Sequence, residues 1–363
     1  MDASKPNNEL PLLPPKVDLE NAKIFKALIK AHRELSGLKG EAKNLINSNI
    51  LFSTLPLQEA KSSSEIENII TTTDQIYQAL SENKNIEDIK NPQVKEVLYY
   101  REAINESLSF LKEKKYLITT NLCKKICSII KNQEMGLRNT PGVKLWNPRT
   151  KKVVYTPPET HKLPDLLKNW EEFVNNNKND LDPILKLAIM HYQFEAIHPF
   201  SDGNGRTGRV LNTLFLITNK LLDHPILDLS YYIHKNKSQY YKLLNNVSSK
   251  GEWIDWVLYI IKAIEVSSYE TRKKIEKIRD LFNESFEKIK TEKISDKKQL
   301  IELIFINPYC RVEHFVDQDL GTRITAKKYL DLLVDKGILK PEKRGRSIIY
   351  INHKLYDLIS EMD

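Results

Sequence analysis

The stretch HPFSDGNGRTGR, residues 198–209, lies between two apolar runs with helical spacing, PILKLAIMHYQFEAI before it and RVLNTLFLI at its end. Pro199 ends the first helix, and Phe200 is apolar enough to anchor the turn in the core. Glycines recur along the second half of the stretch, so the loop can open the second helix with free backbone N–H groups. The stretch therefore predicts two core helices joined by a rigid loop that gathers backbone donors at one place.

The same helical period recurs along most of the chain and predicts an all-α helical bundle. Apolar residues are spaced by three and four in residues 22–40, 97–111, 163–174, 183–197 and 209–222. Residues 1–18 contain PLLPP and are expected to form an extended arm, because proline restricts itself and its predecessor.

Residues 142–155, GVKLWNPRTKKVVY, interrupt the helical pattern. Two strand-like runs flank an Asn-Pro turn, which predicts a β-hairpin. An isolated hairpin needs something to pack on, so it is expected to be a flap over a site, with an ordinary surface loop as the alternative.

The C-terminal part of the chain indicates a separate small domain. Residues 255–295 form a charged amphipathic helical region that leads out of the core. Three short helices follow, the last capped by Thr325, and then a basic turn and a strand-like run, which resemble a winged helix-turn-helix. We expect an N-terminal helical region at 1–105, a core at 106–290 and a winged helix-turn-helix at 291–363.

Composition restricts the class of protein. With 363 residues and 40% hydrophobic content, the chain can fold as two or three domains. It contains neither a long apolar run nor a leader pattern, so a cytoplasmic protein without a membrane segment is expected. The formal charge of +8 allows an anionic partner, either a nucleotide or nucleic acid. Three cysteines are too few for a disulfide framework, and Cys123 and Cys127 are expected to be buried thiols.

The side chains of residues 198–209 fit chemistry on a polyphosphate. Arg206 and Arg209 lie three apart on one side of the second helix and are expected to grip phosphate oxygens. Asp202 beside phosphates calls for a divalent cation such as Mg²⁺ between them. His198 has a pKa suited to taking a proton at neutral pH. The alternative is a simple turn with surface ion pairs, in which His198 only caps a helix.

The twelve residues resemble the signature of the Fic (Fic/DOC) family, His-x-Phe-x-(Asp/Glu)-Gly-Asn-Gly-Arg-x-x-Arg, at every fixed position. The resemblance implies transfer of AMP from ATP to hydroxyl groups of target proteins and of the enzyme itself. His198 would be the general base, Asp202 the Mg²⁺ ligand, and Arg206 and Arg209 the ligands of the β- and γ-phosphates. The nucleotide-binding set implied is Gly203, Asn204, Gly205, Arg206, Thr207, Gly208, Arg209 and Tyr240 or Tyr241, with Tyr241 preferred and core packing as the alternative for the tyrosine pair.

The resemblance also assigns a role to the hairpin. In this family it aligns an extended segment of the target by strand pairing. Related sequences with lysine at the position of Gly205 are kinases, so Gly205 favours nucleotide transfer.

Upstream, SSSEIENII at residues 62–70 resembles the inhibitory motif of the family, with Ser63 and Glu67 on one helical face. A carboxylate beside Arg209 would hold the guanidinium meant for the γ-phosphate. A competing interpretation is a capping box formed by Ser64 and Glu67, which would begin a helix and need no function.

Other functions remain open at this stage. A Fic enzyme can remove AMP or transfer another nucleotide. A protein of a different class would be a DNA-binding regulator that uses the basic wing, Lys343, Arg344 and Arg346, with the core as a nucleotide sensor. The winged helix is alternatively a protein contact, and a homodimer is a further expectation.

Overall fold

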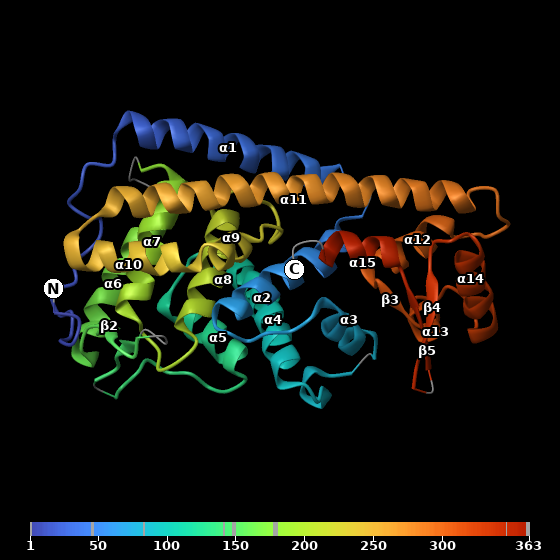
Figure 1. Ribbon diagram of the computed structural model, residues 1–363, viewed down its shortest axis with the longest axis horizontal. Helices are drawn as coiled ribbons and strands as arrows, with labels where there is room; N and C mark the ends of the chain where they lie inside the picture. The colour runs from blue at the N-terminus through green and yellow to red at the C-terminus, as the bar shows by residue number, and fades with distance from the viewer. Residues whose placement is uncertain are drawn as a thin grey trace.

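The computed structural model describes residues 2–44, 47–82, 84–140, 142–146, 150–176, 181–345 and 347–360. The chain is mostly helical, with two small antiparallel sheets, which confirms the predicted fold class (Figure 1). Residues 2–18 contain neither helix nor strand, in keeping with the predicted arm. Among the described residues, no helix is both long and apolar enough to cross a bilayer.

The centre of the molecule is α7 (Pro183–Ile197), which is mostly apolar and buried along almost its whole length. Two tryptophans fix its position from neighbouring helices. Trp170 of α6 (Leu163–Asn175) donates its indole N–H to the carbonyl of Met190 at 3.0 Å, and Trp256 of α11 (Trp253–Ile289) donates to that of Ala188 at 2.8 Å. Because buried indoles need an acceptor, these bonds fix how α7 sits among its neighbours.

The next helix is α8 (Asn204–Thr218). The sequence pattern predicted a helix to residue 222, which is beyond the observed end of α8. Lys220 adopts a left-handed conformation with φ 58°, which ends the helical path. α4 (Pro92–Glu113) and α5 (Thr120–Lys131) pack against α8, and α5 carries the buried Cys123 and Cys127 as predicted.

α1 (Ala22–Lys43) and α11 lie side by side along one edge of the molecule (Figure 1). Glu34 pairs with Arg272 at 3.0 Å, and Glu41 pairs with Arg279. Along each helix the residue of the second pair comes seven positions after that of the first pair, so the two helices run in the same direction. α11 is one continuous helix that links the core with the C-terminal elements.

Four further helices complete the core region. They are α2 (Ser48–Ile66), α3 (Thr73–Ser81), α9 (Leu229–Lys235) and α10 (Lys237–Lys250), and 3-10 turns occupy Ile86–Asp88 and Thr160–Lys162. α2 packs against α4 and α9, so its C-terminal end reaches the start of α8. The predicted boundary between residues 105 and 106 falls inside α4.

The predicted hairpin is present as β1 (Leu145–Trp146) and β2 (Val153–Tyr155), which pair antiparallel. Residues 147–149 of its predicted turn, which lies between the runs 143–146 and 152–155, are outside the described residues. The hydroxyl of Tyr155 donates to the carbonyl of Ala196 at 2.9 Å. This bond fastens the hairpin to the C-terminal end of α7, next to the motif.

The C-terminal elements surround a three-stranded antiparallel sheet in the order β3-β5-β4. In chain order they are α12 (Lys297–Ile306), β3 (Tyr309–Cys310), α13 (Val312–Asp317), α14 (Arg323–Asp335), β4 (Lys340–Arg344), β5 (Ser347–Ile351) and α15 (His353–Ser360). The winged helix-turn-helix stays a prediction.

One detail of the sequence prediction for this region was wrong. The N-cap of α14 is Thr322, whose hydroxyl accepts from the amide of Thr325, so Thr325 lies inside the helix. The basic residues after Gly337 begin with β4, which pairs with the predicted strand β5 along its length, and Gly345 lies in the turn after β4.

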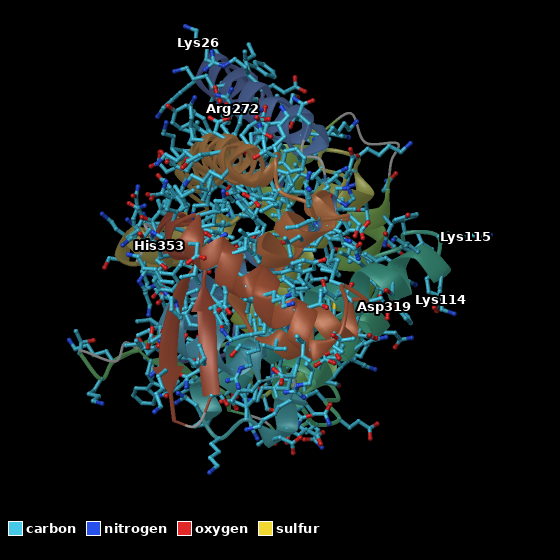
Figure 2. The ribbon with its side chains drawn as sticks, turned by 90° about the vertical axis from the view of Figure 1, so that its right-hand side faces the viewer. Lys26, Lys114, Lys115, Arg272, Asp319 and His353 are labelled. Carbon is cyan, nitrogen blue, oxygen red and sulfur yellow. The ribbon has the colours of Figure 1, made fainter. Side chains whose placement is uncertain are left out.

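Charged side chains cover the outer faces of the molecule. In Figure 2, Lys26 projects from α1 at the top, whereas Lys114 and Lys115 project from the end of α4 on another side. These lysines are spread over separate elements, in agreement with solvated faces.

The pairing of α1 with α11 predicts unequal costs for two truncations on α1. Leu35 is 1% exposed, so Leu35→Ala should lower the free energy of unfolding by about 2–5 kcal/mol. Ile29 is 69% exposed, so Ile29→Ala should change it by less than about 0.5 kcal/mol. Urea unfolding followed by circular dichroism measures both, and equal losses would show that this face of α1 does not contribute to the core as described.

Candidate active site

The loop of the motif is fixed by local backbone geometry. His198 follows α7 in the left-handed conformation, with φ 51°, and its amide donates to the carbonyl of Phe194 at 3.0 Å. Phe200 is fully buried, as predicted. The side chain of Asn204 accepts from the amide of Phe200 and donates to its carbonyl, both at 2.9 Å. The amide side chain of Asn204 therefore closes the loop, a role that the sequence reasoning missed.

The start of α8 offers backbone donors, as the sequence predicted. Gly203 is the N-cap, with φ 81° and no capping side chain. A Cβ at Gly203 would also come 3.2 Å from the sulfur of Cys127, so the position requires glycine twice over. Uncapped amides at a helix start, with the helix dipole behind them, form a site for an anion.

Arg209 is held by the end of α2. Its Nε donates to Ser63 Oγ at 2.7 Å, and its Nη2 donates to the carbonyl of Ser63 at 3.0 Å and to Glu67 Oε1 at 2.8 Å. Arg209 is only 3% exposed, so it is a buried charge with one carboxylate beside it. Ser63, Glu67 and Arg209, three residues selected from the sequence, are thus in direct contact.

Electrostatics favour the charged forms of this pair. Burial alone would raise the pKa of Glu67, but the charge and hydrogen bond of Arg209 outweigh it and hold the pKa below its usual range. Burial would likewise lower the pKa of Arg209, and the carboxylate of Glu67 raises it instead. The two groups therefore stay ionised together.

The capping-box interpretation of Ser64 and Glu67 was wrong. Ser64 lies in the last turn of α2, where its hydroxyl donates to the carbonyl of Ala60 at 2.8 Å, and Glu67 is the C-cap. The helix ends at this point instead of beginning. The described capping box nearby is formed by Thr72 and Gln75 at the start of α3.

Two ionic partners of the motif were not found from the sequence. Arg206 is buried and paired with Glu96 of α4. Asp202 Oδ2 is 2.5 Å from the ammonium of Lys131, the last residue of α5. Burial would raise the pKa of Asp202, but the hydrogen bond and charge of Lys131 lower it. Neither partner is near the motif in the sequence, so only the packing of α4 and α5 against α8 reveals them.

His198 is held as a neutral base. Burial, followed by the positive charge of Arg138, lowers its pKa to about 4. Its ring Nδ1 is buried without a hydrogen-bond partner among the described residues. At neutral pH the imidazole is therefore uncharged, but its pKa lies below the range near neutrality that the sequence reasoning expected, because burial outweighs the nearby carboxylates.

A second buried carboxyl group lies beside the motif. Glu195 Oε1 is buried without a hydrogen-bond partner among the described residues, and it would be 2.5 Å from a Cβ at Gly208. Burial raises the pKa of Glu195 to about 7, against the charge of Arg209. The carboxyl group of Glu195 thus lies directly against α8 at Gly208, and Glu195 is a titratable group that the sequence reasoning missed.

The two tyrosines on α10 differ in their surroundings. Tyr240 is fully buried, and its hydroxyl is 2.8 Å from Nε2 of His191, so it belongs to the core. Tyr241 is 45% exposed. Of the pair, Tyr241 is the one available to a ligand.

The donors present fit a magnesium ion bound largely by its substrate. Among the described residues, no three or more His, Cys, Asp and Glu side chains are grouped to hold a metal. Mg²⁺ is commonly bound by one or two carboxylates together with phosphates and water. Asp202 supplies one such carboxylate at the edge of the anion site, provided that Lys131 gives up its contact.

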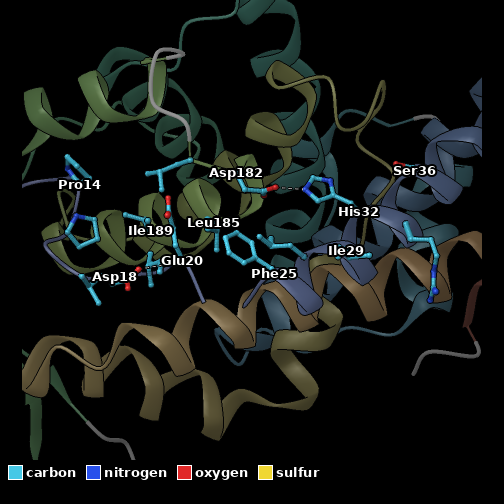
Figure 3. Close-up of a pocket in the computed structure, with 16 residues that line it drawn as sticks. Pro14, Asp18, Glu20, Phe25, Ile29, His32, Ser36, Asp182, Leu185 and Ile189 are labelled. Atoms are coloured by element: carbon cyan, nitrogen blue, oxygen red, sulfur yellow. Dashed lines mark hydrogen bonds and ion pairs between the residues drawn. The ribbon is translucent and has the colours of Figure 1, made fainter. Parts of the chain in front are cut away.

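A pocket of about 740 Å³ lies elsewhere, between the N-terminal arm, α1 and α7. Figure 3 shows it, with Nε2 of His32 2.7 Å from Oδ2 of Asp182. None of residues 198–209 lines it. The motif therefore forms a site separate from this pocket.

Comparison with protein-family models identifies the chain. It matches the Fic/DOC family model over residues 117–216 and the Fic/DOC family N-terminal model over residues 25–109. The chain belongs to the Fic/DOC family. Residues 281–355 of this Fic/DOC protein match the model described as protein adenylyltransferase SoFic-like, C-terminal domain.

Curated relatives resemble parts of this Fic/DOC chain. A probable protein adenylyltransferase of Aquifex aeolicus is 38% identical over 79 residues, which cover 22% of this chain and 24% of the relative. Protein adenylyltransferase fic-1 of Caenorhabditis elegans is 30% identical over 146 residues, or 39% of this chain and 27% of the relative. The matches thus span about a quarter of the length of these relatives.

Solved structures show the same fold. A Fic family protein from Desulfovibrio desulfuricans G20 has a TM-score of 0.54 at 17% identity, covering 90% of this chain and 95% of that one. A Fic domain containing signaling protein from Bacteroides thetaiotaomicron has a TM-score of 0.55 at 16% identity, covering 69% and 96%.

The surroundings of Glu195 predict a pH-dependent effect on stability. Its pKa is about 7 in the folded chain against 4.5 ordinarily, so the folded chain binds more protons between these values. The stabilising contribution of the neutral carboxyl is complete below pH 4.5 and is lost as the pH rises through 7. Glu195→Gln stays neutral, so its Tm should rise relative to that of the natural chain as the pH increases from 5 to 8. Each kcal/mol of unfolding free energy that the natural chain loses corresponds to roughly 2–4 °C.

Differential scanning fluorimetry at several pH values measures this gain. Glu172→Gln, at an exposed position on α6, is the matched control and should show no such trend. A difference for Glu195→Gln that is the same at pH 5 and pH 8 would contradict the described burial.

Proposed function

We propose that this protein transfers AMP from ATP to hydroxyl groups of proteins, including its own. The observation that carries the proposal is the neutral His198 beside an uncapped helix start with two buried arginines. Family membership and the names of the relatives favour adenylyl transfer among the reactions that such a site supports.

The chemistry follows from the placement of these groups. His198 takes the proton of a Ser, Thr or Tyr hydroxyl as its oxygen forms a bond to the α-phosphorus. The bond from that phosphorus to the bridging oxygen breaks, and pyrophosphate leaves with the electron pair. The amides at Gly203, Asn204 and Gly205 stabilise the charge on the α-phosphate, once the amide of Gly203 leaves Asp202 Oδ1, to which it donates at 2.6 Å in this structure. Asp202 would hold a Mg²⁺ ion, which would supply charge neutralisation for the phosphates.

Glu67 is proposed to inhibit the enzyme by occupying Arg209. Three donor contacts of the guanidinium are already directed at Ser63 and Glu67. A Cβ at Gly205 would be 2.5 Å from Glu67 Oε1, so this carboxylate also lies against the proposed phosphate site. A γ-phosphate at Arg209 would meet the negative charge of Glu67 unless that group moves.

The hairpin is proposed to bind the target segment. Trp146 is 57% exposed although it is large and apolar. A two-stranded sheet leaves edges that a third strand can join. Because Tyr155 fastens the hairpin to α7, a segment paired there would lie near His198.

Two alternatives stay predictions. Removal of AMP would use the same site. One of the residues proposed for DNA binding, Arg344, is already engaged within the chain. Its guanidinium donates to Asp74 at 2.7 Å and to Gln78 at 2.9 Å, so it does not support this alternative. Lys343 is exposed, and Arg346 lies outside the described residues. A homodimer also remains an expectation.

The proposal predicts that Glu67→Gly gains automodification. Incubated with ATP and Mg²⁺, this variant should gain the mass of one or more AMP groups, at least about tenfold faster than the natural chain, because Arg209 is freed for phosphate. Intact-protein mass spectrometry measures the gain.

Two variants complete this experiment. Glu65→Gly, in the last turn of the same helix, is the matched control and should show no gain, since Glu65 pairs with Lys61. The double variant Glu67→Gly/His198→Ala should lose the modification. Absence of any AMP on Glu67→Gly, or its persistence without His198, would refute the proposal.

A further inference from the structure

Arg138 is a buried arginine outside the motif, in the segment between α5 and β1. It is 6% exposed. Among the described residues its hydrogen bonds go to backbone carbonyls, and no carboxylate forms a salt bridge with it. Because a buried charge without a counterion is costly, a specific task is expected at this position.

Arg138 holds the turn that carries His198. Its Nε donates to the carbonyl of His198 at 2.8 Å, and its Nη2 approaches that of Ile197 at 3.4 Å. Its own backbone amide donates to the carbonyl of Pro199 at 2.9 Å. One residue thus binds three consecutive carbonyls at the end of α7, where a cation also complements the helix dipole.

The turn needs such support. His198 has φ 51°, which lies in the left-handed region. For any residue other than glycine this conformation is unfavourable in free energy. Its ring position follows from this backbone. A guanidinium fork with fixed geometry suits the task better than a flexible ammonium group.

The same guanidinium reaches the base of the hairpin. Arg138 Nη2 donates to the carbonyl of Pro158, which comes three residues after the end of β2. Tyr155 within β2 binds the carbonyl of Ala196 on α7. The hairpin base and the His198 turn are therefore joined through one side chain.

We propose that Arg138 is a positioning residue that holds the base of the target-binding hairpin and the catalytic histidine as one unit. This inference rests on the proposed adenylyl transfer. Movement of the hairpin base on target binding would act directly on the carbonyl of His198, so the target hydroxyl and the base are set relative to one another by Arg138.

Charge gives the role a second signature. Burial is the main cause of the low pKa of His198, and the charge of Arg138 lowers it further. Three groups around the ring raise its pKa instead. They are the carbonyl of Glu195 on α7, Glu67 at the end of α2 and Asp202 of the loop. Loss of the Arg138 charge should therefore raise the pKa of His198.

The test uses Arg138→Met and Arg138→Lys in the full chain carrying Glu67→Gly. Arg138→Met should lower kcat for automodification by about 100-fold, as expected for a misplaced catalytic group, with the KM for ATP within about threefold. Arg138→Lys retains the charge but not the fork, so it should recover part of kcat.

Titration of His198 by NMR gives a readout that does not depend on activity, with its signal assigned by its loss in His198→Ala. The pKa should rise above about 4 in Arg138→Met, while burial keeps it below its ordinary value, and it should stay low in Arg138→Lys. Arg323→Met is the matched control, since Arg323 is 73% exposed and pairs with Glu313 among the C-terminal elements; it should alter neither kcat nor the pKa.

Unchanged kcat together with an unchanged pKa in Arg138→Met would overturn the inference. If Arg138→Met does not fold, Arg138→Lys decides, since full kcat there would equally overturn it. If Glu67→Gly itself transfers no AMP, the proposed function fails, whereas the titration of His198 still decides whether Arg138 acts on it.

Discussion

The buried ion pair between Arg209 and Glu67 is the contact on which the state of the site depends. A guanidinium that is 3% exposed is stabilised by an anionic partner, and the end of α2 supplies one together with the hydroxyl and carbonyl of Ser63. A triphosphate in the cradle of α8 offers the same guanidinium a second anion. In the proposed reaction only one of the two anions would hold it fully, so the proposal makes this pair the point of control.

The proposed competition depends on the contacts that fix the rest of the site. α7 is buried on all sides and fixed by the indoles of Trp170 and Trp256. The side chain of Asn204 closes the loop, and Arg138 holds the turn at His198. The base and the anion cradle therefore stay in place, whereas Glu67 lies at a helix end, where fewer backbone bonds oppose movement.

Much of the fold was predictable because it depends on local periodicity. The helices around 22–40 and 163–174 follow from apolar spacing, and the site follows from one short run of residues. The end of α8 was overestimated because Leu221 and Leu222 continue the apolar pattern beyond the left-handed Lys220.

The contacts that the sequence did not reveal are those between distant segments. Lys131, Glu96 and Arg138 reach the motif only through the packing of their helices and loops, and no local pattern marks them. Ser64 was ambiguous for a different reason. A serine three residues before a glutamate has the same spacing in the last turn of a helix as at its start, so only the fold decides between the two.

A structure of Glu67→Gly with α,β-methylene ATP and Mg²⁺ tests the central claim most directly, since the analogue cannot transfer AMP. The claim predicts that Arg209 leaves Ser63 and binds the γ-phosphate, with the α-phosphate at the amides of Gly203 to Gly205 and facing His198. An Arg209 that remains on Ser63, with the triphosphate bound away from the start of α8, would contradict it.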